Sequence, residues 1–248
     1  MPLILKSLVI VACVAMATLS SAHAQSQSPQ PMTREQVEQI VREYLLNNPE
    51  IIIEAVQGLE EKQRREAERE RGAALVAKRD QFINDPDAPV GGNPQGDVTV
   101  VEFFDYRCPY CKQMAPALTE LLKTDTKLRF VFKELPILGP DSVVAARAAL
   151  AAHKQGKYVV MHDRLLRHRG GFDEQTIARI AGEIGLDVAR LKADMEKPEI
   201  AAMLDRNRQL ARDLAITGTP AFIVGDKVVP GAVDLQALKN LVADARKR

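Results

Sequence analysis

A pair of cysteines between a strand-like and a helix-like segment limits the possible folds of this chain more than any other feature. Residues 98–105 read VTVVEFFD, and these β-branched and aromatic side chains predict a buried, parallel strand. A Cys-Pro-Tyr-Cys sequence from Cys108 to Cys111 follows closely. The apolar residues after it recur at helical spacing, so the predicted order is strand, cysteine pair, helix.

The predicted position of Cys108 at the start of a helix gives this thiol a particular chemistry. A helix N-terminus presents unpaired N–H groups and the positive end of the helix dipole, so it lowers the pKa of a cysteine there. Cys108 is therefore the predicted nucleophile, and Cys111, one helical turn later, is placed to attack a mixed disulfide. Pro109 suits the first turn because no N–H group is needed there, and Tyr110 is placed to modulate the thiolate.

A zinc half-site and an inert buried pair are the other interpretations of the two cysteines. Zinc requires two further ligands, and the histidines beyond the N-terminal segment, His153, His162 and His168, lie in a region with a helical pattern. The spacing therefore favours redox chemistry. We expect no metal site and no cofactor.

The N-terminus has the pattern of a secretory signal peptide. Lys6 precedes an apolar run at residues 8–19, and an Ala-His-Ala cleavage signal ends at Ala24. The apolar run is shorter than the roughly 20 residues of a transmembrane helix. A lipoprotein cleavage box ending at Cys13 is the alternative, but Lys6 lies too close to it to leave an apolar core. We therefore expect residues 1–24 to be removed on export to the periplasm, together with Cys13.

Composition argues that the cysteine pair has a chemical rather than a structural role. The chain has 34 Lys and Arg against 33 Asp and Glu, so it carries no electrostatic signature for nucleic acid or an anionic membrane. A chain of this length can bury a core without disulfide staples. A disulfide that closes so short a loop would stabilise it by only roughly 2 kcal/mol.

Residues 25–83 have a helical pattern with an exposed apolar stripe. Thr33 and Gln36 form a predicted capping box at the start of a first helix, and Asn48 with Pro49 begins a second one. The stripe continues through the second helix to Leu59 and is followed by a run of mixed charges, EEKQRREAERER. Such a run is a solvated face or linker in one interpretation, and a stalk that joins an oligomerisation helix to a catalytic domain in the other. We favour the stalk because the stripe exposes too much apolar surface for a lone helical arm.

A Pro-, Gly- and Asp-rich segment at residues 84–97 predicts a linker, and a domain at residues 98–248 follows it. A second strand is expected at residues 128–135, and a helical insertion at about residues 141–214. Gly225 and Asp226 predict a hairpin turn between two strands, with a final helix after it. The expected fold class is α/β.

The segments EFFDYRCPYC and GTPAFIV resemble the DsbA branch of the thioredoxin superfamily, which consists of exported thiol–disulfide oxidoreductases. The resemblance implies a thioredoxin fold with an inserted helical domain, preceded here by an N-terminal helical stalk. It also implies that Pro220 is cis and places the Thr219 backbone beside Cys108 to bind substrate. Glu102 matches the buried acid that moves a proton to or from Cys111, a role that Asp105 could share; an ordinary strand-edge carboxylate is the alternative for Glu102.

Two positions resemble the isomerase and reductase side of that branch rather than its monomeric oxidase. Tyr110 replaces a histidine between the cysteines, and Thr219 replaces a valine before the cis-proline. The segment LLNNPEIIIEAVQGLE at residues 45–60 resembles the oligomerisation segment of ScsC-like (suppressor of copper sensitivity) relatives, some of which are trimeric disulfide isomerases.

The resemblance implies a set of partners and two alternative functions. The partners are exported protein substrates that contain cysteines, a membrane redox partner and further copies of the chain, with a trimer as the expected oligomer. A disulfide isomerase or reductase is the expected activity. An exported dithiol oxidase, or a protein that holds copper(I) with the same two sulfurs, is the alternative.

Overall fold

The computed structural model describes residues 31–247, so the predicted signal peptide lies outside the described residues. The chain divides into two compact units, Met1–Leu59 and Glu60–Arg248. Within residues 31–247, no helix combines the length and the apolar character that a membrane crossing requires.

The first helix of the N-terminal unit, α1 (Arg34–Asn47), has the predicted capping box. The Thr33 hydroxyl accepts a hydrogen bond from the Gln36 N–H at 3.3 Å, and the Gln36 side chain accepts one from the Thr33 N–H at 2.9 Å. The next helix, α2 (Glu50–Ala77), begins after the predicted break. Asn48 caps the C-terminus of α1, because its side-chain amide donates a hydrogen bond to the Tyr44 carbonyl near the end of that helix.

The apolar stripe of the N-terminal unit is exposed. No residue of α1 is buried. The large apolar side chains exposed in this unit are Met32, Val37, Ile40, Val41, Tyr44, Leu46, Ile52, Ile53, Val56 and Leu59. So many large apolar side chains exposed along two consecutive helices are typical of a surface that another chain covers.

The second unit is built on a five-stranded sheet with the strand order β1-β3-β2-β4-β5. Its strands are β1 (Val90–Gly92), β2 (Val98–Phe104), β3 (Leu128–Glu134), β4 (Ala221–Val224) and β5 (Lys227–Pro230). Strands β2 and β3 are parallel, whereas β1, β4 and β5 each pair antiparallel with their neighbours. Gly225 has a φ of +64° in the turn between β4 and β5, so the predicted hairpin is confirmed.

Strand β1 lies inside residues 84–97, which were predicted to be a linker. Its three residues, VGG, carry no alternating pattern, and their extended conformation comes from pairing with the edge of β3. The glycines are needed there, since a Cβ on Gly91 would lie 2.9 Å from the Phe132 ring and Gly92 has a φ of +67°. The segment is thus part of the sheet over these residues.

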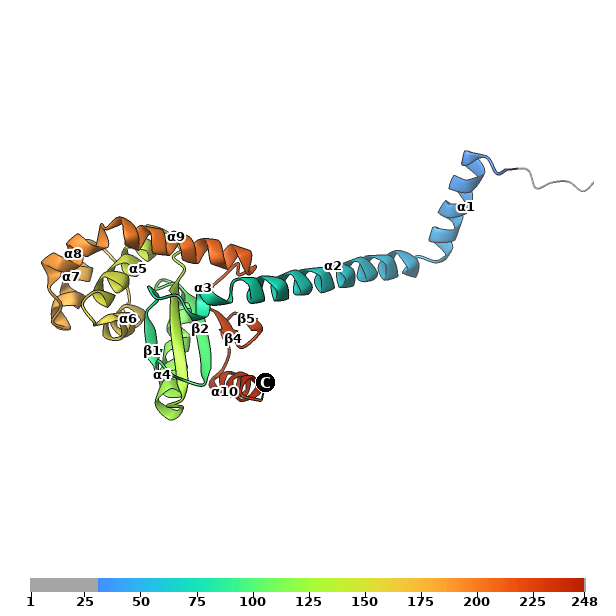
Figure 1. Ribbon diagram of the computed structural model, residues 1–248. Coiled ribbons are helices and arrows are strands. Elements are labelled where there is room, and N and C mark those ends of the chain that lie inside the picture. Colours follow the sequence, from blue (N-terminus) through green and yellow to red (C-terminus); the bar gives the residue numbers. More distant parts are fainter. Residues whose placement is uncertain (1–30, 248) are drawn as a thin grey trace, which may run out of the picture. The chain divides into compact units, whose positions relative to one another are not determined.

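Helices cover both faces of the sheet (Figure 1). One face packs against α4 (Pro109–Thr124) and α10 (Leu235–Ala245). The insertion between β3 and β4 consists of α5 (Pro140–His153), α6 (Tyr158–Arg167), α7 (Glu174–Glu183), α8 (Val188–Met195) and α9 (Pro198–Asp213). The helical insertion and its breaks at Gly170, Gly185 and Pro198 therefore agree with the sequence pattern.

The other face of the sheet is covered by the end of the predicted stalk and by the end of the helical insertion. Leu75 at the end of α2 and Phe82 in α3 (Arg79–Ile83) are buried, and they share a core cluster with Phe103 of the sheet and Leu214. The predicted stalk therefore contributes to the core of the second unit over its last residues.

Candidate active site

Cys108 occupies the position before the first residue of α4, as the sequence predicts. Its backbone is extended, with φ −66° and ψ 119°, and Pro109 is the first residue of the helix. The Cys111 N–H donates a hydrogen bond to Cys108 Sγ at 3.4 Å. Both cysteines are buried free thiols. The helix N-terminus therefore directs an N–H group at the sulfur of Cys108.

The Thr219–Pro220 peptide bond is cis, which confirms the expectation drawn from the sequence resemblance. The Cys108 thiol donates a hydrogen bond to the Thr219 carbonyl, with an Sγ–O distance of 3.1 Å. These residues are far apart in the sequence and meet because β4 pairs with β2, where Ala221 lies opposite Phe103.

The two thiols have opposite pKa shifts. The pKa of Cys108 is lowered to about 5, chiefly by a hydrogen bond with the Cys111 side chain. Burial opposes this shift. Hydrogen bonds with the Thr219 side chain and with the N–H groups of Cys111 and Tyr110 lower the pKa further. The pKa of Cys111 is raised, first by its hydrogen bond with Cys108 and then by burial and by the charge of Glu102. At neutral pH the arrangement therefore favours a thiolate at Cys108 beside a thiol at Cys111.

Glu102 lies in β2 with its side chain buried on the face of the sheet that α4 covers. It is 1% exposed, and its Oε2 atom has no hydrogen-bond partner in the described part of the chain. Burial, followed by the charge of Cys108, raises the pKa of Glu102 to about 8. A buried carboxyl group with a pKa near neutrality can donate a proton in its acid form and accept one in its carboxylate form.

Asp105 is held by hydrogen-bond donors from two loops. Its buried carboxylate accepts hydrogen bonds from the Arg107 N–H at 2.7 Å, the Ile137 and Leu138 N–H groups at 2.8 and 3.0 Å, and the Ser142 hydroxyl at 2.7 Å. These donors occupy both oxygens. Asp105 therefore joins the loop after β3 to the segment before Cys108, and that loop presents the exposed apolar side chains of Ile137 and Leu138.

A second buried acid, Glu134 at the end of β3, was not predicted. Its carboxylate accepts a hydrogen bond from the Tyr158 hydroxyl, and burial raises its pKa to about 7. Nearby, the Tyr106 hydroxyl lies 3.0 Å from His162 Nδ1, so that histidine already has a polar partner. The only sequence signal for Glu134 is an acidic residue at the end of an apolar strand, and many exposed carboxylates share it.

Tyr110, another predicted site residue, lies at the surface of the site. The Tyr110 side chain is 60% exposed, and only its backbone contributes to the pKa of Cys108. Within residues 31–247, no three His, Cys, Asp or Glu side chains come together as metal ligands would.

Comparison with known proteins identifies the second unit. The family described as DSBA-like thioredoxin domain matches residues 99–243. The chain belongs to this family. A second family, described as the copper resistance protein ScsC N-terminal domain, matches residues 34–66. The thioredoxin fold with a helical insertion and an N-terminal helical region is therefore the fold of this DsbA-family, ScsC-like chain.

Individual relatives of this DSBA-like domain protein agree with that assignment. A thioredoxin-like oxidoreductase from Silicibacter pomeroyi is 49% identical, with a TM-score of 0.67 over 68% of this chain and 98% of that one. Proteus mirabilis ScsC in a transitional conformation is 30% identical, with a TM-score of 0.65 over 86% of this chain and 94% of that one. The chain is also 34% identical over 183 residues to the Na(+)/H(+) antiporter NhaA 3 of Salinispora tropica. That match covers 71% of this chain but only 28% of the antiporter.

The pH dependence of alkylation is expected to separate the two thiols. As pH falls through about 5, the rate of Cys108 alkylation should fall, because the thiolate becomes protonated; above that value the rate should be nearly constant. Cys111 should react slowly throughout the neutral range, since its pKa is raised. Mass spectrometry of the reduced protein after timed iodoacetamide pulses measures both rates.

The Cys111→Ala variant provides the control for this titration. It removes the largest cause of the low pKa of Cys108, so its midpoint should lie above that of the parent protein. A parent midpoint near the ordinary cysteine value of about 8.5 would show that the helix N-terminus and Cys111 do not stabilise the thiolate.

Proposed function

We propose that this protein is a periplasmic disulfide isomerase or reductase that acts on exported proteins through Cys108 and Cys111. The observation that carries the proposal is the position of Cys108 Sγ, which lies between the N-terminus of α4 and the Thr219 carbonyl and has a pKa of about 5. Membership of a thiol–disulfide exchange family supports it, as does the predicted signal peptide.

The first step is attack of the Cys108 thiolate on one sulfur of a substrate disulfide. The bond between the two substrate sulfurs breaks, a mixed disulfide forms with Cys108, and the second substrate sulfur leaves as a thiolate. In isomerisation that thiolate attacks another disulfide of the same substrate. A substrate thiolate finally displaces Cys108, which leaves as a thiolate again, so no net oxidation occurs.

In reduction, Cys111 completes the reaction. Its thiol loses a proton and attacks Cys108 Sγ, the substrate leaves as a dithiol, and a Cys108–Cys111 disulfide remains. Both electrons come from the cysteine pair, so a membrane redox partner must reduce the pair again. The cis-proline loop binds the substrate chain in this proposal, with the Thr219 backbone beside the mixed disulfide.

We assign the proton of Cys111 to Glu102. Formation of the mixed disulfide removes the negative charge of Cys108, which is one cause of the raised pKa of Glu102, so Glu102 ionises more readily at this stage. Its carboxylate then accepts the proton that Cys111 must lose.

The Glu102→Gln variant should therefore release substrate from the mixed disulfide about a hundredfold more slowly, the size of a typical general-base effect. Its first attack on substrate should be nearly unchanged. Rapid-quench analysis of both steps measures this, with the Glu134→Gln variant as a control that alters another buried acid. Equal release rates in Glu102→Gln and the parent protein would leave Glu102 with a packing role only.

The N-terminal unit is proposed to join several copies of the chain, with three as the proposed number. Its exposed apolar stripe and the match of residues 34–66 to the ScsC N-terminal domain support this assignment. Several active sites on one assembly raise the local concentration of a second site once a first has engaged a substrate.

Assays of reduction and isomerisation, with and without copper, test the proposed function. The protein should reduce insulin and refold scrambled ribonuclease, and copper(I) should add no activity of its own. Tight copper(I) binding without either activity would favour the alternative in which two soft sulfurs hold the metal. The redox state of Cys108 and Cys111 in cells distinguishes an isomerase from an exported dithiol oxidase, since an isomerase rests as a dithiol and an oxidase as a disulfide.

A further inference from the structure

A small cavity lies beside the cis-proline loop of the second unit. It has a volume of about 180 Å³ and is lined by residues 215–221, by Val228, Pro230 and Gly231, and by Arg71 of α2. Thr219 belongs to this lining, and its carbonyl lies 3.1 Å from Cys108 Sγ. The cavity is therefore next to the position that a bound substrate cysteine would occupy.

Arg71 is the charged residue of this lining, and its guanidinium has no partner in the part of the chain that the structure describes. The other lining residues are uncharged. The Nε atom of Arg71 is buried and makes no hydrogen bond. A guanidinium carries N–H donors in a planar fork that matches a carboxylate, and a buried donor without an acceptor is unfavourable. The cavity therefore presents an unsatisfied site for an anion.

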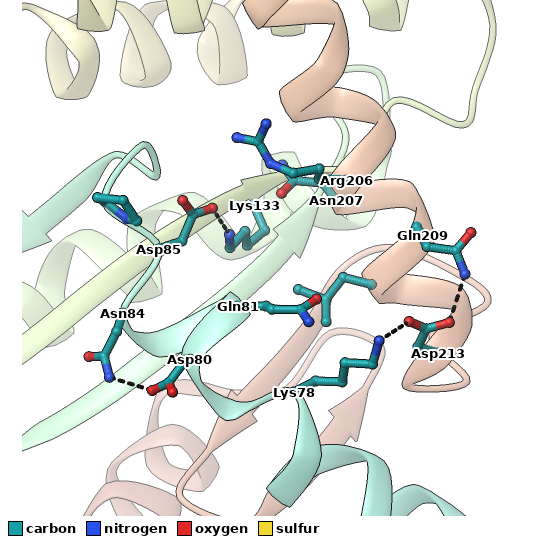
Figure 2. A pocket seen from close by; sticks show the side chains of 12 residues that line it. Lys78, Asp80, Gln81, Asn84, Asp85, Lys133, Arg206, Asn207, Gln209 and Asp213 are labelled. Atoms are coloured by element: carbon teal, nitrogen blue, oxygen red, sulfur yellow. Dashed lines mark hydrogen bonds and ion pairs between the residues drawn. The ribbon is translucent and has the colours of Figure 1, made fainter.

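A second pocket of the same unit, between α3 and α9, differs from the Arg71 cavity because its basic side chains form ion pairs (Figure 2). Its lysines are paired, Lys133 with Asp85 at 2.5 Å and Lys78 with Asp213 at 3.0 Å. The Asp85 and Asp213 carboxylates thus neutralise the two lysines, and the third cation of the lining, Arg206, pairs with Asp87 at 2.8 Å. The cavity at Arg71 has no such acid in its lining, so its positive charge is available to a ligand.

The walls of the Arg71 cavity are fixed by the end of α9. Ala215 adopts a φ of +53°, and the Ile216 N–H donates to the Ala211 carbonyl at 2.8 Å, which ends the helix and directs the chain toward Thr219. A non-glycine residue in the left-handed region is held there by its surroundings. The cavity is therefore a preformed feature of the loop that carries the cis-proline.

The other side of the cysteine pair also carries positive charge. A separate hollow there is lined by Pro109, Lys112 and Arg169, among others, and lacks acidic residues in its lining. The Lys112 ammonium donates to the His168 carbonyl at 2.6 Å, so its charge is not neutralised by an acid. A polypeptide bound across Cys108 would meet positive charge in both directions.

We propose that Arg71 forms an anion subsite that binds an aspartate or glutamate side chain of the substrate close to the cysteine bonded to Cys108. This inference rests on the proposed function. An extended chain advances about 3.3 Å per residue, so a side chain within a few residues of the substrate cysteine reaches the cavity next to Thr219. The protein thereby selects acidic segments of exported proteins.

Three peptides that differ only in charge test the subsite. Each contains one cysteine as a 2-thiopyridyl disulfide, flanked by glutamates, glutamines or lysines. The Cys108 thiolate attacks the peptide sulfur, the S–S bond breaks, and 2-thiopyridone leaves and is followed by absorbance in a stopped-flow instrument. The full-length reduced protein should react about fivefold faster with the glutamate peptide than with the glutamine peptide, the effect of one favourable exposed ion pair.

The variants isolate Arg71 from the rest of the surface. Arg71→Met keeps an apolar stem and should react equally with the glutamate and glutamine peptides, Arg71→Glu should prefer the lysine peptide, and Arg71→Lys should keep part of the original preference. Arg69→Glu makes the same charge change at an exposed position of the same helix, and its preference should match that of the parent. Each variant should react with the glutamine peptide at the parental rate, which shows that it is folded.

Two results would overturn the subsite while leaving the proposed function intact. One is an unchanged preference in Arg71→Glu, and the other is an equal shift in Arg69→Glu. A parent protein that reacts with none of the three peptides would contradict the proposed function, and the subsite would fall with it.

Discussion

Replacing Cys111 by alanine is expected to leave exported proteins covalently attached to Cys108, whereas replacing Cys108 by alanine should reduce disulfide exchange to the uncatalysed background. Cys108 has the low pKa and lies at the N-terminus of α4, whereas Cys111 is buried with a raised pKa. Only Cys108 can therefore begin the reaction at neutral pH. Non-reducing gels and mass spectrometry of the purified protein detect the trapped partners.

A protein with both the Cys108→Ala and the Cys111→Ala substitutions serves as the control, because it retains the rest of the site without either sulfur. Trapped proteins in Cys108→Ala, and none in Cys111→Ala, would reverse the assignment of the two cysteines. Acid trapping before lysis keeps the mixed disulfides from exchanging during preparation, since thiolates are protonated at low pH.

Removal of residues 25–59 is expected to yield a folded monomer that reduces insulin but has lost most of its isomerase activity. The unit Glu60–Arg248 is compact by itself, and the core residues Leu75 and Phe82 stay in the shortened chain. The cysteine pair is therefore unchanged. Isomerisation should fall about tenfold or more, because the second active site is no longer at a high local concentration.

Light scattering tests the change in assembly, and refolding of scrambled ribonuclease tests the change in activity. A substitution within the stripe, Val56→Glu, should reproduce the effect of the truncation, since it places a charge on the apolar surface. Gln57→Glu, at the exposed neighbouring position, should leave both properties unchanged. A monomeric parent, or a truncated protein that isomerises equally well, would favour a simple exported dithiol oxidase.

Local sequence patterns were sufficient for the elements that hold the two cysteines. The β-branched run before the pair, Pro109 at the first turn and the helical spacing after it each act over a few residues. They therefore predicted strand β2, helix α4 and the place of Cys108 between them. The helix breaks within the insertion were also predictable, because Gly readily adopts the positive φ that ends a helix and Pro lacks the N–H group that a helix interior requires.

Long-range contacts decided what those patterns left open. Strand β1 exists because β3 offers it an edge, and Asp105 joins two loops because four donors converge on it. Neither feature has a local signal. Thr219 was expected near Cys108 only through a family resemblance, since no periodicity connects residues so far apart in the chain.

The sequence by itself determined the order of strand, cysteine pair and helix, and with it the thiol chemistry of Cys108. The tertiary structure alone decided that Glu134 is a second buried acid and that Arg71, on a helix of mixed charge, lines a cavity with the cis-proline loop. The reason is physical: helix and strand formation depend on neighbours a few residues away, whereas burial and the absence of an ion partner depend on which distant segments the fold brings together.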